Sequence, residues 1–283
     1  MVDPTEAREL WMKAEPFHAV TYFAPEVRAS LDELGLVGFW MGYFAARSAP
    51  FGAVGPSVVE ATFYNFHPSL VRRAIPDAWE RASPAAILAA RDRGLRRALV
   101  QLVGEVPERL AGAATRVALT LVPEGRPLFA AHADLDWADD PLMATWQATT
   151  RIREHRGDGH VAILTSEGVG PCESHALAVG RRVTTRELVR RARAWEDEDW
   201  ALAIESLHRR GLVDPSGGLT DAGTALSAHI ERRTDELSSA GAVDVDPSDL
   251  GELIDGLGLL TDALTALLPF PNPIGLPRAA TDA

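Results

Sequence analysis

The chain has 283 residues and a formal net charge of -12 at pH 7, from 28 basic and 40 acidic side chains. Such an acidic balance argues against a surface dedicated to nucleic acid or to anionic membranes. The single cysteine, Cys172, excludes an internal disulfide and a zinc cluster built on thiolates. We recognise no signal peptide and no apolar run long enough to span a bilayer, so we expect a cytoplasmic protein without a membrane partner.

The N-terminal residues predict a series of helices. The first begins at Asp3, a second apolar run follows Pro16, and further helices span residues 25–34 and 38–47. Residues 38–47 are apolar on nearly every side, which is typical of a buried helix. His18 and Tyr22 lie four residues apart in the second run, so on a helix they share a face.

A polar segment at residues 151–160 follows a stretch, residues 126–141, that has little periodicity and reads as a linker. Gly157 and Gly159 predict a sharp turn between two helices. Asp158 would then cap a helix that begins near residue 160. The turn would bring the two histidines of the segment close together.

Three readings stay open for this segment and for Glu173 and His175 on the following helix. The side chains form a polar structural network, contact a ligand, or hold a divalent metal through imidazole and carboxylate groups. No spacing matches a strong metal motif such as H-E-x-x-H, so the metal and any cofactor stay unassigned. For a catalytic site, the candidates are His160 or His155 as general base and Arg153 or Arg156 as anion clamp.

Residues 184–237 carry the pattern of a winged helix. Apolar residues at helical spacing, among them Trp200 and Leu207, precede Gly211, which ends that helix. A short hairpin is predicted at residues 213–219, and Thr220 caps a long amphipathic helix after it. This order resembles the winged helix of the MarR-type regulators.

The charges of the same segment argue against its usual function. The helix that would enter the major groove opens with four acidic residues, 196–199. Residues 184–237 contain eight arginines against eleven acidic residues, and the wing at 214–218 contains no arginine. Because DNA affinity depends largely on neutralised phosphates, we expect that DNA is not a partner. The alternative is that these carboxylates only solvate a surface helix.

Short motifs recur at nearly one offset and predict an internal duplication. Gly55-Pro56 recurs as Gly170-Pro171, Trp79 as Trp195, and residues 70–74 and 93–95 as 188–192 and 210–212. We therefore predict a mostly α protein of two tandem winged-helix-like modules, residues 1–125 and 142–240, forming an intrachain pseudo-dimer. A small β-wing is expected in the second module only, because residues 96–105 continue as apolar helix. Chance matching in an Arg- and Ala-rich chain is the alternative.

Residues 241–283 are predicted to form a final helix and a tail rich in proline. The apolar spacing of residues 245–268 is helical, whereas the prolines of residues 269–277 exclude a helix. The tail is too apolar to be solvated along its length. We expect it to dock on the body of the protein or over its site.

An asymmetric pocket is expected between the modules, because the break at residues 47–52 is apolar and the one in the second module is polar. The three tyrosines lie in apolar helices, so each hydroxyl needs a buried partner or a ligand. Plain core packing is the alternative for the aromatic residues. The candidate ligand-binding residues are His18, Tyr22, Tyr43, Arg47, Arg153, Asp158, Glu173 and His175.

Four motifs together resemble an actinobacterial family of unknown function, usually catalogued as helix-turn-helix or MarR-like. They are H-A-V-T-Y-F at residues 18–23, residues 38–52, R-E-H-R-G-D-G-H at residues 153–160, and P-N-P-I-G at residues 271–275. The resemblance implies the fold and a cytoplasmic setting. It implies no activity or ligand.

The leading hypothesis is a small-molecule-binding protein on a winged-helix scaffold that has lost ordinary DNA binding. The ligand would lie between the modules, and the sequence leaves open whether histidine acid–base chemistry also transforms it. The alternatives are a MarR-like DNA-binding regulator and a metal-dependent enzyme with histidine and carboxylate ligands. Both a monomer and a homodimer are compatible with the sequence.

Overall fold

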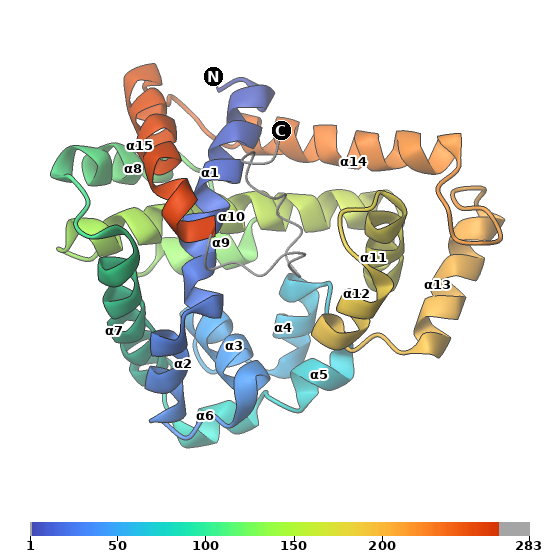
Figure 1. Cartoon of the computed structure of the whole chain (residues 1–283), viewed down its shortest axis with the longest axis horizontal. Coiled ribbons are helices and arrows are strands. Elements are labelled where there is room, and N and C mark those ends of the chain that lie inside the picture. Colours follow the sequence, from blue (N-terminus) through green and yellow to red (C-terminus); the bar gives the residue numbers. More distant parts are fainter. Residues whose placement is uncertain (1, 266–283) are drawn as a thin grey trace.

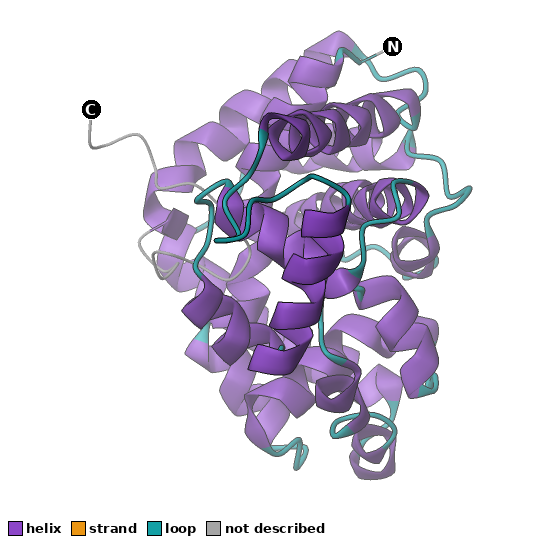
Figure 2. Cartoon of the chain, turned by 90° about the vertical axis from the view of Figure 1, so that its right-hand side faces the viewer, coloured by secondary structure: helices purple, strands orange, loops and turns teal. Residues whose placement is uncertain are grey.

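The computed structural model describes residues 2–265, and these are mostly helical (Figures 1 and 2). In this part of the chain there is no strand, only two isolated bridges, which join Val213 to Leu219 and Leu121 to Ala242. The predicted helical class is therefore confirmed. Among the described helices, none combines the length and the apolarity needed to cross a membrane.

The helices are α1 (Pro4–Phe23), α2 (Pro25–Asp32), α3 (Gly38–Ser48), η1 (Ala49–Phe51), α4 (Pro56–Phe63), α5 (Pro68–Arg72), α6 (Asp77–Arg81), α7 (Pro84–Val103), α8 (Glu108–Leu119), α9 (Pro127–Ala133), α10 (Pro141–Ser166), α11 (Pro171–Gly180), α12 (Arg186–Arg193), α13 (Asp197–Arg209), α14 (Asp221–Ala240) and α15 (Pro247–Thr265).

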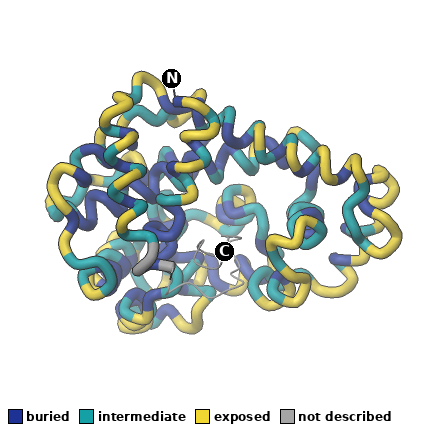
Figure 3. The backbone as a smooth tube through the Cα atoms, turned by 45° about the horizontal axis from the view of Figure 1, so that its top comes forward, coloured by how far each residue is buried: buried dark blue, intermediate teal, exposed yellow. Residues whose placement is uncertain are grey.

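Two apolar cores divide the described residues, and α10 connects them. The larger core is built by α1 to α9, the first half of α10 and α15. The smaller core is built by the end of α10 and by α11 to α14. In Figure 1, α10 runs across the molecule with α14 above it and with α11 to α13 at its far end. Figure 3 shows that buried residues gather inside, whereas exposed residues follow the outer turns.

The predicted interruption at Pro16 is wrong, because α1 continues through it to Phe23. Proline removes one helical hydrogen bond, here the bond to the carbonyl of Met12. Met12 lies on the exposed side of the helix, and the remaining hydrogen bonds of α1 keep it continuous. The uninterrupted helix places His18 and Tyr22 on one face, as predicted.

The predicted turn at Gly157 and Gly159 is also wrong, because α10 is continuous from Pro141 to Ser166. A Cβ atom on Gly159 would lie 1.7 Å from Nη1 of Arg126. The glycine therefore makes room for this guanidinium group, whose Nη1 donates to the carbonyl of His155. The chain instead turns after the end of α10, where Gly168 has a φ of +62°.

Asp158 does cap a helix, but a different one from the helix that we predicted. Its carboxylate accepts hydrogen bonds from the backbone N–H groups of Leu128 and Phe129, both at 2.9 Å. These two residues lie in the first turn of α9, inside the stretch that we predicted as a linker. The expectation of an irregular linker was therefore wrong at residues 127–133.

The motifs of the predicted duplication behave unequally. Gly55-Pro56 and Gly170-Pro171 both begin a helix, α4 and α11. Gly94 lies inside α7, where a Cβ atom would be 2.5 Å from the carbonyl oxygen of Glu26. Its predicted counterpart Gly211 instead follows the end of α13 with a φ of +69°. One shared motif thus serves helix packing in one half and helix termination in the other.

Two further expectations concern helices α3 and α15 of the larger core. Helix α3 is only half-buried rather than buried on nearly every side, since Phe39 is 41% exposed. Helix α15, the predicted C-terminal helix, packs on α1, α7 and α8. The predicted docking tail lies outside the described residues.

The predicted start of α14 is confirmed. Oγ1 of Thr220 accepts a hydrogen bond from the backbone N–H of Gly223 at 3.1 Å. The N–H of Thr220 in turn donates to the carbonyl of Leu212 at 3.1 Å. These bonds seat the first turn of α14 on the residues that follow α13.

Replacing Gly223 by Ala should destabilise the protein by about 2–3 kcal/mol, since overpacking at such a contact outweighs the better helix propensity of alanine. A Cβ atom there would lie 1.9 Å from the carbonyl oxygen of Leu212, which is backbone and cannot rotate away. Urea denaturation measures the change. Gly251→Ala, on α15 with no atom within 4 Å of the added Cβ, is the matched control and should not destabilise. A Gly223→Ala protein as stable as this control would contradict the contact.

Candidate ligand-binding cleft

A cleft of about 680 Å³ lies between the two cores. Helices α1, α3 and α4 line one side, and α10, α11, α12 and α14 line the other. Pockets for small molecules usually have volumes of about 300–1,000 Å³. The size and the place of this cleft therefore suit a small ligand held between the halves of the chain.

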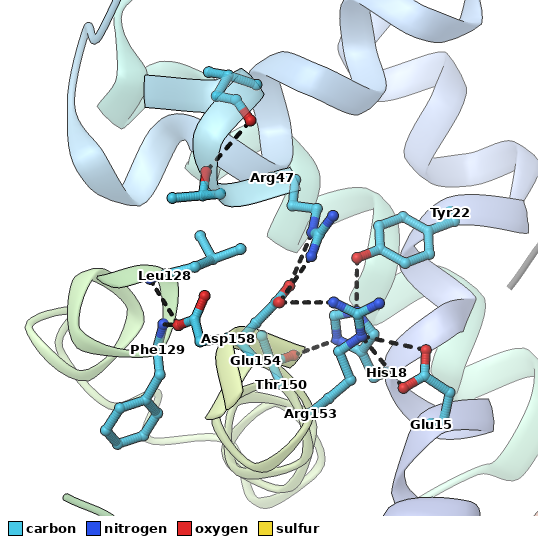
Figure 4. Close-up of polar contacts among 12 residues, drawn as sticks. Glu15, His18, Tyr22, Arg47, Leu128, Phe129, Thr150, Arg153, Glu154 and Asp158 are labelled. Carbon is cyan, nitrogen blue, oxygen red and sulfur yellow. Dashed lines mark hydrogen bonds and ion pairs between the residues drawn. The ribbon is translucent and has the colours of Figure 1, made fainter. Parts of the chain in front are cut away.

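A buried carboxylate, Glu154 on α10, organises the wall of the cleft (Figure 4). Its two oxygens accept from Nε and Nη2 of Arg47 on α3, both at 2.9 Å, and one also accepts from Nη1 of Arg153 at 2.7 Å. Arg153 continues to both oxygens of Glu15 on α1, at 3.3 Å. Burial alone would raise the pKa of Glu154, but Arg153 and Arg47 hold it well below its usual range.

A second, smaller chamber of about 40 Å³ lies behind Arg47 and Glu154. There the ring of His18 pairs through Nδ1 with Oγ1 of Thr150 at 2.9 Å and through Nε2 with the hydroxyl of Tyr22 at 2.7 Å (Figure 4). Burial, with the charge of Arg153, lowers the pKa of His18 well below its usual range, so the ring is neutral at pH 7. Burial also raises the pKa of the Tyr22 hydroxyl.

Three arginines of the cleft lie over aromatic rings. The guanidinium carbon of Arg47 is 4.2 Å from the ring centre of Phe63. The corresponding distances are 4.4 Å from Arg193 to Phe66 and 4.7 Å from Arg156 to Trp11. Cation–π contacts of this kind orient the guanidinium plane and keep apolar surface beside the charge.

A second group of ion pairs lies farther along the cleft, around Glu231 on α14. This carboxylate lies 3.1 Å from Arg8, 3.6 Å from Arg156 and 2.8 Å from Arg181. Arg8 and Arg156 also reach Asp235, each at 2.8 Å. The cleft is therefore bordered at two places by carboxylates that several arginines share.

The structure places most of the predicted residues on the cleft or the chamber. Tyr43, Arg47, Arg153, Asp158, His160 and His175 line the cleft, and His18, Tyr22, Tyr43 and Arg47 line the chamber. Two do not line either space. Glu173 instead accepts from the N–H of Gly170 and so caps α11, and His155 packs against Phe129.

The two predicted catalytic histidines thus have different surroundings. Nδ1 of His160 lies 3.0 Å from Oγ1 of Thr234, and burial lowers the pKa of His160 to about 4. Burial and the nearby charge of Arg126 lower the pKa of His155 to about 3. Both rings are therefore neutral at pH 7, and only His160 reaches the cleft.

Sequence reasoning missed several residues of the site. The most important are Glu154, Glu15, Glu231, Arg193 and His132. Glu154 stands between Arg153 and His155 in a motif that we had singled out, and an acid flanked by cations is the signal that could have found it. Nothing in the local pattern connects Glu15 or His132 to the site, because tertiary packing alone brings them there.

The metal-enzyme alternative gains no support from the described residues. Among them, no group of three or more histidine, cysteine, aspartate or glutamate side chains is arranged to hold a metal ion. The predicted side chains are engaged separately: His160 contacts Thr234, His175 contacts the carbonyl of Asn65, and Asp158 and Glu173 cap helices.

The segment predicted as a winged helix lies at one end of the molecule, where α13 forms the edge in Figure 1. Its exposed side presents the acidic Asp197, Glu198 and Glu205. The preceding helix α12 has the opposite character, with exposed Arg186 and Arg190. The two signs of charge partly neutralise each other, as in the 2.7 Å pair of Arg186 with Asp197.

Comparison with known proteins gives one relationship. No curated protein and no solved structure matches the chain. Residues 7–271 match a family described as a helix-turn-helix family, which is nearly the whole chain. The order of α11, α12, α13 and α14 agrees with this match, and the protein belongs to the helix-turn-helix family.

Proposed function

We propose that this protein binds a small molecule in the cleft between its two cores. The observation that carries the proposal is the cleft itself, whose volume of about 680 Å³ is bordered by buried charged groups and aromatic rings. Buried ion pairs are costly unless their geometry is excellent, and they recur where a site must hold polar groups in place. The hydrogen bonds among Arg47, Glu154 and Arg153 hold these three charged side chains in place on one wall of the cleft.

The scaffold of this site is, in our proposal, a MarR-like winged helix that has lost ordinary DNA binding. The helix α13, the bridge between Val213 and Leu219, and α14 follow the order of a winged helix. The acidic exposed side of α13 would be repelled by phosphates. A pseudo-dimer of two related modules would explain why the cleft lies between two cores, and it is compatible with a monomer or a homodimer.

If the ligand is also transformed, His160 is the cleft histidine best placed for acid–base work. With its pKa lowered to about 4 it is neutral at pH 7 and can accept a proton. Arg153, which is hydrogen-bonded to Glu154 on the same wall of the cleft, would then orient an anionic group of the ligand.

Filling the cleft tests the proposal. Ala178 on α11 lines the cleft and takes part in no ion pair, so Ala178→Trp should occupy the ligand's space while keeping every charged side chain of the wall. Native mass spectrometry of the protein purified from its host should show a bound mass that the variant lacks. Ala201→Trp, at an exposed position of α13, is the matched control and should keep that mass. No added mass on the wild-type protein, or equal occupancy in Ala178→Trp, would contradict ligand binding.

Transcriptional regulation is the second candidate, and membership of a helix-turn-helix family is the observation that favours it. The exposed arginines at the end of α11 and on α12 provide some positive surface: Arg181, Arg182, Arg186, Arg190 and Arg191.

A gel-shift assay at low salt distinguishes the two candidates. We expect no specific retardation of the DNA upstream of the protein's own gene, because the acidic face of α13 repels phosphates. A specific complex that weakens steeply between about 50 and 200 mM salt would instead establish the regulator. Arg190→Ala would then reduce that salt dependence, whereas Arg109→Ala on α8, away from the helix-turn-helix, would not.

A further inference from the structure

The cleft is cationic although the chain as a whole is acidic. Its lining contains seven arginines and four acidic side chains, against a net charge of -12 for the full sequence. The arginines are Arg8, Arg47, Arg153, Arg156, Arg181, Arg182 and Arg193, and the acids are Glu15, Glu154, Asp158 and Glu231. A surplus of one sign in a recess attracts ligands of the other sign.

The carboxylates of the cleft do not offset this surplus one for one. Glu154 is shared by two guanidinium groups, one of which also reaches Glu15, and Glu231 is shared by three, two of which also reach Asp235. Asp158 uses its carboxylate to cap α9, and burial raises its pKa to about 6. The negative charges are therefore either shared or directed away from the open space.

Apolar surface accompanies the positive charge. The rings of Trp11, Phe63 and Phe66 line the cleft, together with Leu164 and Ile230. Three of the guanidinium groups lie over these rings, so charged and apolar surfaces alternate within a few ångströms. A ligand that fits both surfaces must combine an anionic group with an apolar body.

We propose that the ligand of the cleft is an amphipathic anion, a carboxylate, sulfonate or phosphate carried on an apolar body. The anionic group would lie against the guanidinium groups of Arg182 and Arg193. Arg153 would add its positive charge, because its Nε and Nη1 already donate to Glu15 and Glu154. The apolar body would lie against Phe63 and Phe66. This inference rests on the proposed function and names the class of its ligand.

A pair of fluorescent probes tests the charge preference on the full-length protein. The anionic probe is 8-anilinonaphthalene-1-sulfonate, and the neutral probe of nearly the same shape is N-phenyl-1-naphthylamine. We expect the sulfonate to bind at least roughly tenfold more tightly, the difference of one charge-assisted hydrogen bond. Equal affinities would overturn the anion preference and leave the binding cleft in place. Failure of both probes to bind would overturn the proposed function as well.

Matched variants locate the effect. Ala178→Trp should lose both probes, which would place them in the cleft. Arg182→Met removes an exposed cleft cation, and Arg193→Met removes one that lies over Phe66. Each should weaken sulfonate binding roughly tenfold and leave the neutral probe unaffected. Arg209→Met, which removes the same charge from the exposed end of α13, should change neither affinity.

Two results would overturn the proposal. One is an Arg182→Met protein that binds the sulfonate as the wild-type protein does. The other is an Arg209→Met protein that loses affinity equally, because the probe would then respond to total charge. Circular dichroism and the melting temperature verify folding, and Arg182→Met carries the test if Arg193→Met does not fold.

Discussion

Replacing Glu154 by Ala is expected to lower the free energy of unfolding by about 3–5 kcal/mol, the usual cost of removing one partner from a buried ion pair. Glu154 is 1% exposed and binds the guanidinium groups of both Arg47 and Arg153. The substitution leaves Arg153 with Glu15, but it leaves Arg47 with only the hydroxyl of Tyr43 among the hydrogen bonds described here. A buried guanidinium group without its carboxylate carries the full cost of lost hydration.

Urea denaturation at pH 7 measures the loss, with Glu205→Ala on the exposed side of α13 as the control. The double variant Arg47→Met with Glu154→Leu should recover part of the stability, because a buried ion pair replaced by apolar side chains is often close to neutral. A Glu154→Ala protein as stable as the control would mean that water reaches the pair. A double variant no better than the single one would assign the loss to packing instead.

Local signals predicted the C-terminal half of the fold well. The end of α13 at Gly211, the bridge at Val213 and the cap at Thr220 depend on residues within a few positions of each other. Helix caps and glycines with positive φ are short-range features, so the sequence alone is enough to locate them. The order of elements followed from them.

The middle of α10 shows where such signals fail. Gly157 and Gly159 resemble a turn, but the helix runs through both. The neighbour at Gly159 is Arg126, which lies far away in the sequence and whose guanidinium group fills the position of the missing side chain. Only the tertiary structure shows that Gly159 makes room for the side chain of Arg126 and does not bend the helix.

The sequence could predict which types of residue form the candidate site, but it could not predict which of them form ion pairs with each other. Histidine, tyrosine and arginine in apolar helices indicated a polar interior, and His18, Tyr22 and Arg47 do lie together at the chamber. The partner of Arg47 is Glu154, 107 positions later in the chain. Such a pairing depends on which faces of α3 and α10 meet, and periodicity within each helix carries no information on that.

Buried neutral histidines predict that the protein loses stability steeply between pH 7 and pH 5. Burial lowers the pKa of His132 and His155 to about 3 and of His160 and His175 to about 4, and it also lowers that of His18. An unfolded histidine titrates near pH 6.5.

The sign follows from proton binding. Well above pH 6.5 neither state binds these protons, so the stability is complete. As the pH falls, the unfolded state takes up protons that the folded state refuses, and the folded state is disfavoured until the pH reaches the folded pKa values. Glu154 adds a loss only below its ordinary pKa near 4.5, where the unfolded carboxyl becomes protonated.

Each histidine should cost about 1 kcal/mol between pH 7 and pH 5.5, so five together cost about 5–6 kcal/mol. That is comparable to the whole stability of many domains, about 5–15 kcal/mol. Urea denaturation at steps of half a pH unit measures the slope, and His160→Gln should reduce it by one proton while folding normally at pH 8. A stability that stays constant from pH 7 to pH 5 would show that the folded protein binds these protons too, and that the imidazoles are open to water rather than enclosed between the helices.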